Sequence, residues 1–300
     1  MRLLSDAKEL RILVIHLLPK KTMKPIISVE ELVLLHNDDV VLIDARSGAD
    51  ASAEYKKFHL RGAVHMHLEF DLAMKTSNAA QGGRHPLPTI ETFADMLGEA
   101  GVTRNSRVII YDDKNGANAA ARLWWMLRAI GHTTVQVIDG GMEHALKAGF
   151  PADDELVKRS RITSYKTNEW KLPVVTIDEV DGMTKDENYV VVDVRSRERY
   201  RGEVEPIDLV AGHIPKAINI PFTENLDGEG KFKSPLELKQ KFELALHQRK
   251  QEQVVVHCGS GVTACHTILA MNYAGMDFPN LYVGSWSEWS RAGKEIAKGE

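Results

Sequence analysis

The segment QVVVHCGSGVTACHTILAMNY, residues 253–273, combines three structural signals in a row. Val254, Val255 and Val256 form a short β-branched run, which is typical of a buried strand. Residues 258–263, CGSGVT, carry glycine at alternating positions and predict a tight loop, and residues 263–273 are mostly helix-forming. A strand, a glycine loop and a helix start therefore follow one another, an arrangement in which backbone N–H groups converge on an anion.

Cys258 is the first residue of this loop. Backbone N–H groups around a thiol favour the thiolate, which is the nucleophilic form of cysteine. The alternative is a buried structural cysteine, but that role does not need two glycines beside it. We therefore expect a reactive thiol at Cys258, surrounded by the backbone of Gly259, Gly261, Val262 and Thr263.

The composition limits the classes of protein to be considered. A chain of 300 residues, 43% hydrophobic and 27% charged, is typical of a globular protein with about two domains. With 38 basic and 42 acidic residues the net charge is −4, so nothing predicts a nucleic acid or a membrane surface as partner. Cys258 and Cys265 are the only cysteines, which fits a reducing compartment and predicts a cytoplasmic protein.

Residues 1–25 precede the first domain-like pattern. Residues 10–18 are apolar but are interrupted by Arg11 and His16, and the basic leading region and small-residue cleavage site of a secretory signal are not clear. Met23 begins MKPIISVEELV, which resembles an ordinary domain start. We expect residues 1–22 to be a peripheral extension, upstream of an alternative start.

The chain repeats itself at low similarity. Residues 28–32 and 176–180 each have a polar N-cap with a carboxylate at the third helical position. Each is followed by an apolar strand that ends in Asp-x-Arg, over residues 40–46 and 190–195. Short apolar strands alternate with helical stretches in both units, so we expect an α/β fold with two tandem domains, each a mainly parallel sheet with helices on both faces.

The two units differ at the nucleophile. Asp112 stands where the second unit has Cys258, and the loop after it carries one glycine and no thiol. The first unit is therefore expected to form a wall of the active site rather than to react. The predicted organisation is an extension over residues 1–25, a non-catalytic domain over 26–151, a polar linker over 152–173 and a catalytic domain over 174–300.

Six motifs extend over both units: Ile43–Arg46, His59-x-x-Gly62-Ala63, Arg122–His132, Asp139–Gly141, Gly212–Pro215 and the loop 258–263. With these motifs, the chain resembles the tandem-domain rhodanese-like sulfurtransferases over about residues 26–295. The loop CGSGVT is similar to the 3-mercaptopyruvate branch of that family, whereas the thiosulfate branch usually carries basic residues just after the cysteine, and none follow Cys258.

The resemblance implies sulfur transfer in two halves without a cofactor. Cys258 takes the outer sulfur of a small anionic donor and becomes a persulfide, which splits one difficult transfer into two. An acceptor thiol then removes that sulfur; a small thiol or a thioredoxin-like protein is expected, and cyanide serves in a test tube. The donor is expected to be 3-mercaptopyruvate, with thiosulfate as the alternative.

The resemblance also implies a substrate arginine at Arg199, where Glu198 replaces the usual glycine. A guanidinium group can hold a carboxylate through two hydrogen bonds. The 3-mercaptopyruvate branch often has a second arginine after a Glu-Pro pair. Here Glu205-Pro206 is followed by Ile207 and Asp208, so that arginine is absent.

Ser260 matches a serine that pairs with a histidine and an acid in the 3-mercaptopyruvate branch. His85 matches the histidine, and Glu69 stands at the acid position in place of aspartate. A Ser–His–carboxylate relay would move the proton that the pyruvate enolate needs as it leaves.

Other readings of these residues carry less support. The phosphatases that share this architecture need an arginine six residues after the cysteine, where this chain has Ala264. The alternative from a different class is a persulfide carrier or binding protein without fast turnover. His65 and His67 lack a third spaced ligand, so we predict no metal site, and Cys265 is expected to be a packed small residue.

Overall fold

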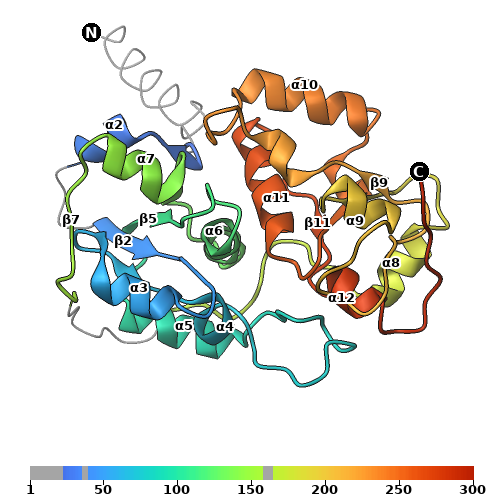
Figure 1. Cartoon of the computed structure of the whole chain (residues 1–300), viewed down its shortest axis with the longest axis horizontal. Helices are drawn as coiled ribbons and strands as arrows, with labels where there is room; N and C mark the ends of the chain where they lie inside the picture. Colours follow the sequence, from blue (N-terminus) through green and yellow to red (C-terminus); the bar gives the residue numbers. More distant parts are fainter. Residues whose placement is uncertain (1–22, 36–39, 158–164) are drawn as a thin grey trace, which may run out of the picture.

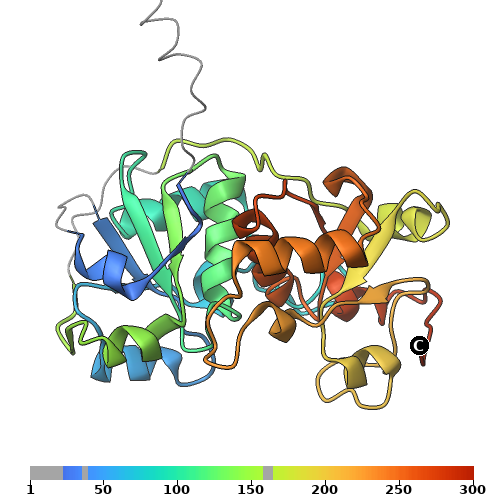
Figure 2. The same ribbon diagram turned by 90° about the horizontal axis from the view of Figure 1, so that it is seen from above.

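The computed structural model describes residues 23–35, 40–157 and 165–300, which form two lobes side by side, each around its own sheet (Figure 1 and Figure 2). The predicted extension over residues 1–22 lies outside the described residues. The first sheet is parallel throughout. Its strands, in spatial order, are β1 (Ile26–Ile27), β6 (Val135–Ile138), β5 (Arg107–Tyr111), β2 (Val40–Asp44) and β4 (Val64–His65).

The second sheet repeats this order. Its parallel strands are β11 (Asn280–Leu281), β10 (Val254–His257), β8 (Val190–Asp193) and β9 (Ile218–Asn219). Val174 forms a parallel bridge to Leu281 and so takes the place that β1 has in the first sheet. The predicted α/β fold with two duplicated parallel sheets is therefore confirmed.

Helices flank both sheets, and several begin where the sequence predicts. Ser28 and Glu31 form a capping box at the start of α2, and Thr176 and Glu179 form one at α8. Among the described residues, no helix is long and apolar enough to cross a bilayer. The helices are α2 (Val29–Val33), α3 (Ala51–Lys57), α4 (Leu68–Asp71), α5 (Ile90–Glu99), α6 (Ala119–Ala129), α7 (Gly141–Lys147), α8 (Ile177–Met183), α9 (Arg197–Arg201), α10 (Pro235–Ala245), α11 (Thr263–Tyr273) and α12 (Ser285–Trp289), with 3-10 turns η1 (Phe222–Asn225) and η2 (Gln251–Gln253).

The two Asp-x-Arg motifs form the same buried ion pair at the end of a strand. Arg195 Nη2 donates to Asp193 at 2.6 Å and to the Gly212 carbonyl at 2.7 Å. Arg46 repeats this arrangement on Asp44, at 2.6 Å. Because each guanidinium also satisfies a loop carbonyl, the pair fixes the chain just after the strand.

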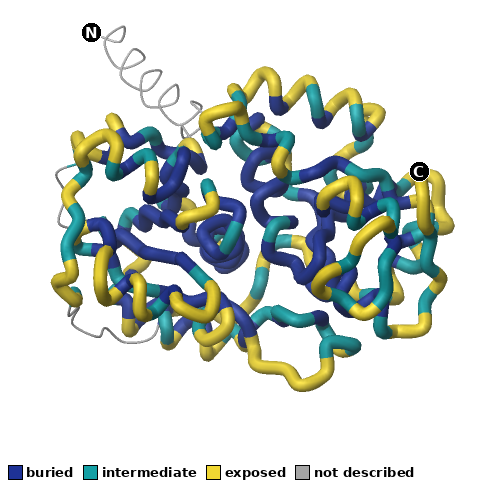
Figure 3. Tube along the Cα trace, viewed as in Figure 1, coloured by how far each residue is buried: buried dark blue, intermediate teal, exposed yellow. Residues whose placement is uncertain are grey.

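The two lobes share one apolar core, because α6 and α11 pack against each other at the centre of the molecule (Figure 1 and Figure 3). Val254 and Val256 of β10 face this shared core, whereas Val255 faces a separate core on the outer side of its sheet. This alternation follows from the two-residue period of a strand. The lobes are therefore joined by apolar packing and not by the linker alone.

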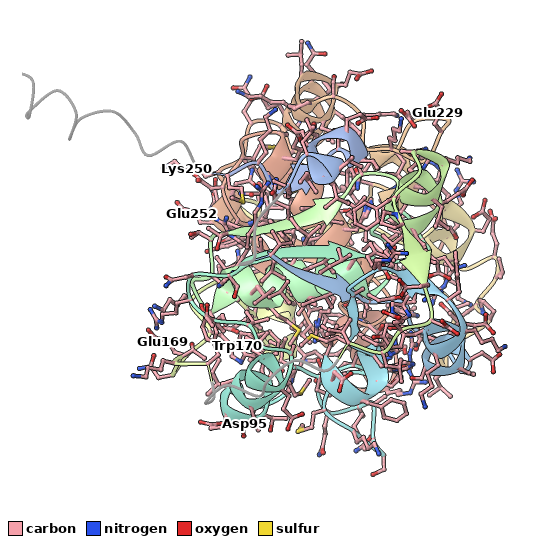
Figure 4. The ribbon with its side chains drawn as sticks, turned by 90° about the vertical axis from the view of Figure 1, so that its left-hand side faces the viewer. Asp95, Glu169, Trp170, Glu229, Lys250 and Glu252 are labelled. Atoms are coloured by element: carbon pink, nitrogen blue, oxygen red, sulfur yellow. The ribbon has the colours of Figure 1, made fainter. Side chains whose placement is uncertain are left out.

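The segment predicted to be a linker lies along the first lobe where it is described. Ala152–Asp153 form a short strand, β7, antiparallel to β3 (His59–Leu60). Trp170, labelled in Figure 4 together with Asp95 of α5, stacks on Phe93 of α5 at 5.5 Å between ring centroids. Strand pairing and aromatic packing thus attach both ends of this segment to the first lobe.

His266 of α11 makes the stability of the fold sensitive to acid. Its ring is fully buried and stacks on Phe232 at 4.6 Å. Burial lowers the pKa of His266 from its ordinary value near 6.5 to about 3. Below pH 6.5 the His266 ring therefore binds a proton in the unfolded chain but stays neutral in the folded chain. The free energy of unfolding is thus highest above pH 6.5 and decreases as the pH drops.

We predict that His266 accounts for about 2 kcal/mol of the loss in unfolding free energy between pH 7 and pH 5. His266→Phe keeps a ring against Phe232 but cannot be protonated, so its loss over the same pH interval should be smaller by that amount. Urea unfolding of both proteins at both pH values measures the difference. Equal losses in the two proteins would contradict this role of His266.

Candidate active site

Cys258 lies between β10 and α11 and is only 2% exposed. Its backbone N–H donates to Ser285 Oγ at 3.2 Å, and its carbonyl accepts from the N–H of Trp286 at 3.0 Å. Ser285 itself has a φ of 54°, a left-handed conformation that non-glycine residues seldom adopt. The start of α12 therefore holds both backbone groups of the predicted nucleophile.

The loop after Cys258 needs glycine at Gly261. Its φ is +73°, and a Cβ there would lie 2.6 Å from the carbonyl oxygen of Val283. Only glycine tolerates both the backbone conformation and this close approach. At Gly259 the Cβ position faces guanidinium groups instead, 3.3 Å from Arg84 Nη2. The loop is thus packed against Val283, two residues after β11, on one side and faces basic side chains on another.

The cysteine loop leaves backbone donors free. Among the residues that the structure describes, none accepts a hydrogen bond from the N–H groups of residues 259–262. The first lobe differs: there the Asp112 carboxylate accepts from four N–H groups of its own loop, those of Lys114, Gly116, Asn118 and Ala120, at 2.8 to 3.2 Å. Burial raises the pKa of Asp112, and these donors oppose that shift.

Asp112 and Cys258 occupy equivalent places in the two lobes. The Asp112 carbonyl accepts from the N–H of Met142 at 3.0 Å, just as Cys258 accepts from Trp286. The loop of the first lobe is therefore filled by its own carboxyl group. In the second lobe, the corresponding N–H groups have no acceptor among the described residues.

Ser260, His85 and Glu69 lie in a row. His85 Nδ1 is 2.8 Å from Ser260 Oγ, and His85 Nε2 is 2.7 Å from Glu69 Oε1. Burial lowers the pKa of His85, although Glu69 opposes the shift, so the ring is neutral at pH 7. A carboxylate at Nε2 favours the proton there and leaves Nδ1 to accept from the Ser260 hydroxyl.

His85 reaches Ser260 because the loop between α4 and α5 crosses to the second lobe below α12 (Figure 1). Gly82 N–H donates to Glu288 Oε1 at 2.7 Å. Gly83 has a φ of +79°, and a Cβ there would lie 2.9 Å from both Gly284 Cα and Ser287 Oγ. The backbones of the two lobes therefore approach so closely that only glycine fits.

Arg122 of α6 contacts both the cysteine loop and the loop that carries His85. Its guanidinium is fully buried and donates to the carbonyls of Gly261, at 3.2 Å, and His85, at 3.1 Å. Cys265 Sγ also lies 3.3 Å from the Gly261 carbonyl, and burial raises the pKa of this thiol to about 12. Cys265 is thus a protonated, packed thiol at neutral pH.

Arg199 lies over the loop from the other side. Its Nη1 and Nη2 are both 3.6 Å from the Cβ position of Gly259, and Nη2 donates to Glu205 at 2.7 Å. The side chain keeps 17% of its surface exposed, so a ligand can reach it. Arg197 and Arg201 form ion pairs elsewhere.

One ring nitrogen of His65 and one of His67 each lie against a backbone carbonyl. His65 Nε2 lies 3.0 Å from the Arg46 carbonyl, and His67 Nε2 lies 3.0 Å from that of Gly48. Within the described ranges, no group of three or more His, Cys, Asp or Glu side chains is arranged to hold a metal ion.

Three residues at this site were not predicted from the sequence: Arg84, Arg122 and Ser285. Arg122 is part of a shared motif, but nothing local marks it as a support for the cysteine loop. A signal for Arg84 exists in the Gly82-Gly83 pair before it, since adjacent glycines indicate a close backbone approach.

Residues 28–148 and 176–292 both match the rhodanese-like domain, so the chain belongs to the rhodanese-like family. A probable 3-mercaptopyruvate sulfurtransferase of Pseudomonas aeruginosa is 37% identical over 85% of this chain and 90% of its own. A thiosulfate sulfurtransferase of Bos taurus is 34% identical over 80% of both chains. The structure of 3-mercaptopyruvate sulfurtransferase from Leishmania major has a TM-score of 0.80 at 29% identity, over 92% of this chain and 76% of that chain.

We predict that Gly83→Ala lowers the free energy of unfolding by about 1–3 kcal/mol more than Gly149→Ala. Gly149 has a φ of +81° with no atom within 4 Å of its Cβ position, so it reports the backbone strain without the contact between lobes. Urea unfolding of both variants gives the comparison. Equal losses of unfolding free energy in the two variants would mean that the contact between the lobes at Gly83 does not contribute to stability.

Proposed function

We propose that this protein is a sulfurtransferase that moves a sulfane sulfur from 3-mercaptopyruvate, through a persulfide on Cys258, to an acceptor thiol. The observation that carries the proposal is the pair of contacts at His85, 2.8 Å to Ser260 and 2.7 Å to Glu69, beside the cysteine loop. A proton relay at that place suits a donor whose leaving group must be protonated on carbon.

In the first half-reaction, the Cys258 thiolate attacks the donor sulfur and the carbon–sulfur bond breaks. The electron pair of that bond goes to carbon and forms the enolate of pyruvate. Neutral His85 accepts, through the Ser260 hydroxyl, the proton that the donor's own thiol loses, and the same path returns this proton to the enolate carbon. Atoms and charge balance without a cofactor: the Cys258 thiolate and 3-mercaptopyruvate become a persulfide anion and pyruvate.

The remaining groups stabilise negative charge. The N–H groups of residues 259–262 can donate to the thiolate and to the persulfide anion, and fixed backbone dipoles need no reorganisation during the reaction. Arg199, partly exposed beside Gly259, is the proposed contact for the donor carboxylate. The first lobe contributes His85 and Glu69 but no nucleophile, which is the proposed division between a supporting and a catalytic domain.

Thiosulfate is the second candidate donor, because a thiosulfate sulfurtransferase is among the relatives at 34% identity. Its leaving group, sulfite, needs no proton on carbon. A slow persulfide carrier is a third candidate. We place the protein in a reducing compartment such as the cytoplasm, since Cys258 and Cys265 are both free thiols. A small thiol or a thioredoxin-like protein is the proposed acceptor there.

We predict that the wild-type protein turns over 3-mercaptopyruvate faster than thiosulfate and that Cys258→Ser abolishes both reactions, since serine cannot form a persulfide. Steady-state rates with cyanide as acceptor, measured side by side, test this. Thermal unfolding checks that the variant is folded. Dominant thiosulfate turnover would overturn the proposed donor, and residual activity in Cys258→Ser would overturn the mechanism.

We predict that Ser260→Ala and His85→Gln lower kcat with 3-mercaptopyruvate by about 10²- to 10⁴-fold, the usual size of acid–base catalysis, and change thiosulfate turnover little. His144→Gln, in α7 of the first lobe, is the control. Because the pKa of His85 is lowered below 6.5, its neutral form persists at pH 6.5 and 3-mercaptopyruvate turnover should fall only at lower pH. Equal effects on both donors would remove the relay from the reaction.

A further inference from the structure

Asp208 occupies the region where the 3-mercaptopyruvate branch often has its second arginine. Its side chain is fully buried and accepts from three guanidinium groups. Arg199 donates at 3.2 Å, Arg291 at 3.1 Å, and Arg84 reaches it from the first lobe. A carboxylate therefore lies in the region where related proteins often have an arginine. This carboxylate binds three arginines from other parts of the chain.

Two of these arginines face the same point beside the nucleophile. The Cβ position of Gly259, the residue after Cys258, lies 3.3 Å from Arg84 Nη2 and 3.6 Å from both terminal nitrogens of Arg199. These are the three atoms nearest to that point, and none of them belongs to Arg291. The side chains of Arg84 and Arg199 are 25% and 17% exposed, so neither is sealed off from a ligand.

The cluster carries one positive charge more than its own carboxylates balance. Its guanidinium groups are those of Arg84, Arg195, Arg199 and Arg291, and its carboxylates are Asp193, Glu205 and Asp208. The sum is 4 − 3 = +1. One further carboxylate, brought by a ligand, would neutralise it.

We propose that Arg84 is a donor-binding residue: its guanidinium and that of Arg199 together hold the carboxylate of the sulfur donor over Gly259. Arg84 then supplies from the first lobe the second arginine that is absent after Pro206. The inference rests on the proposed function for the identity of the donor, but not for the anion site itself.

The backbone around Arg84 is built for this position. Its N–H donates to Ser287 Oγ at 3.1 Å, and Gly83 brings the chain against Gly284. The next residue is His85, so one loop of the first lobe delivers both an anion contact and the proton relay. Donor binding would consequently bridge the two lobes across the cysteine.

Alkylation of Cys258 tests the anion contact without any turnover. Iodoacetate and iodoacetamide react by the same displacement, but only iodoacetate carries a carboxylate. In Arg84→Met the iodoacetate rate should fall about tenfold or more relative to wild type, the effect of losing one charged hydrogen bond, while the iodoacetamide rate stays within about twofold. Peptide mass mapping confirms that the label is on Cys258.

Arg291→Met is the matched control, because it also removes a guanidinium from Asp208 but not from Gly259. It should leave the ratio of the two alkylation rates unchanged, and Arg199→Met should lower it as Arg84→Met does. Thermal unfolding checks each variant, and Arg84→Gln serves if Arg84→Met does not fold. An unchanged ratio in the Arg84 variant, or an equal fall in Arg291→Met, would reduce Arg84 to a structural contact between lobes.

Steady-state kinetics separate this proposal from the proposed function. With 3-mercaptopyruvate, Arg84→Met should raise KM by about 10- to 100-fold with a smaller change in kcat, and Arg84→Lys should recover part of the loss. If the alkylation ratio falls but wild type does not use 3-mercaptopyruvate, the anion site stands and the donor is wrong. If wild type uses 3-mercaptopyruvate and the ratio is unchanged, the proposal for Arg84 is wrong.

Discussion

The site depends on one close contact between backbones, that of Gly83 in the first lobe with Gly284 in the second. A Cβ atom at Gly83 would lie 2.9 Å from Gly284 Cα, so the two backbone segments are in direct contact. This contact sets the position of Arg84 and His85, the next two residues, over the cysteine loop. The shared core around α6 and α11 makes the contact possible, because it holds the two lobes at a fixed separation.

Duplication accounts for the proposed division between a catalytic lobe and a supporting lobe. Both lobes end their central strand in a loop that surrounds an acidic group, and in the first lobe that group is the Asp112 carboxylate, already bonded to its own loop. In the second lobe, none of the described residues accepts from the corresponding N–H groups, which we propose hold a sulfur anion. A loop of the first lobe reaches this place, where Glu69 and His85 meet Ser260.

Much of the architecture was predictable from local patterns. The capping boxes at Ser28 and Thr176 and the alternation of strands and helices indicated both sheets and their repetition. The row of Ser260, His85 and Glu69 was predicted through a family resemblance, since no local pattern links residues 175 positions apart. Arg84 was not predicted, because the Gly82-Gly83 pair indicates a close backbone approach but does not show what the next side chain contacts.

Local sequence patterns specify the elements and their chemistry: β-branched runs form strands, polar N-caps start helices, and glycine at residue 261 allows a backbone conformation that other residues avoid. These are properties of neighbouring residues, so they can be read locally. Which side chains of one lobe face the cysteine of the other depends instead on the folded arrangement of the two lobes. That choice depends on the packing of α6 on α11 and on the docking of a distant loop, and neither is encoded in any single segment.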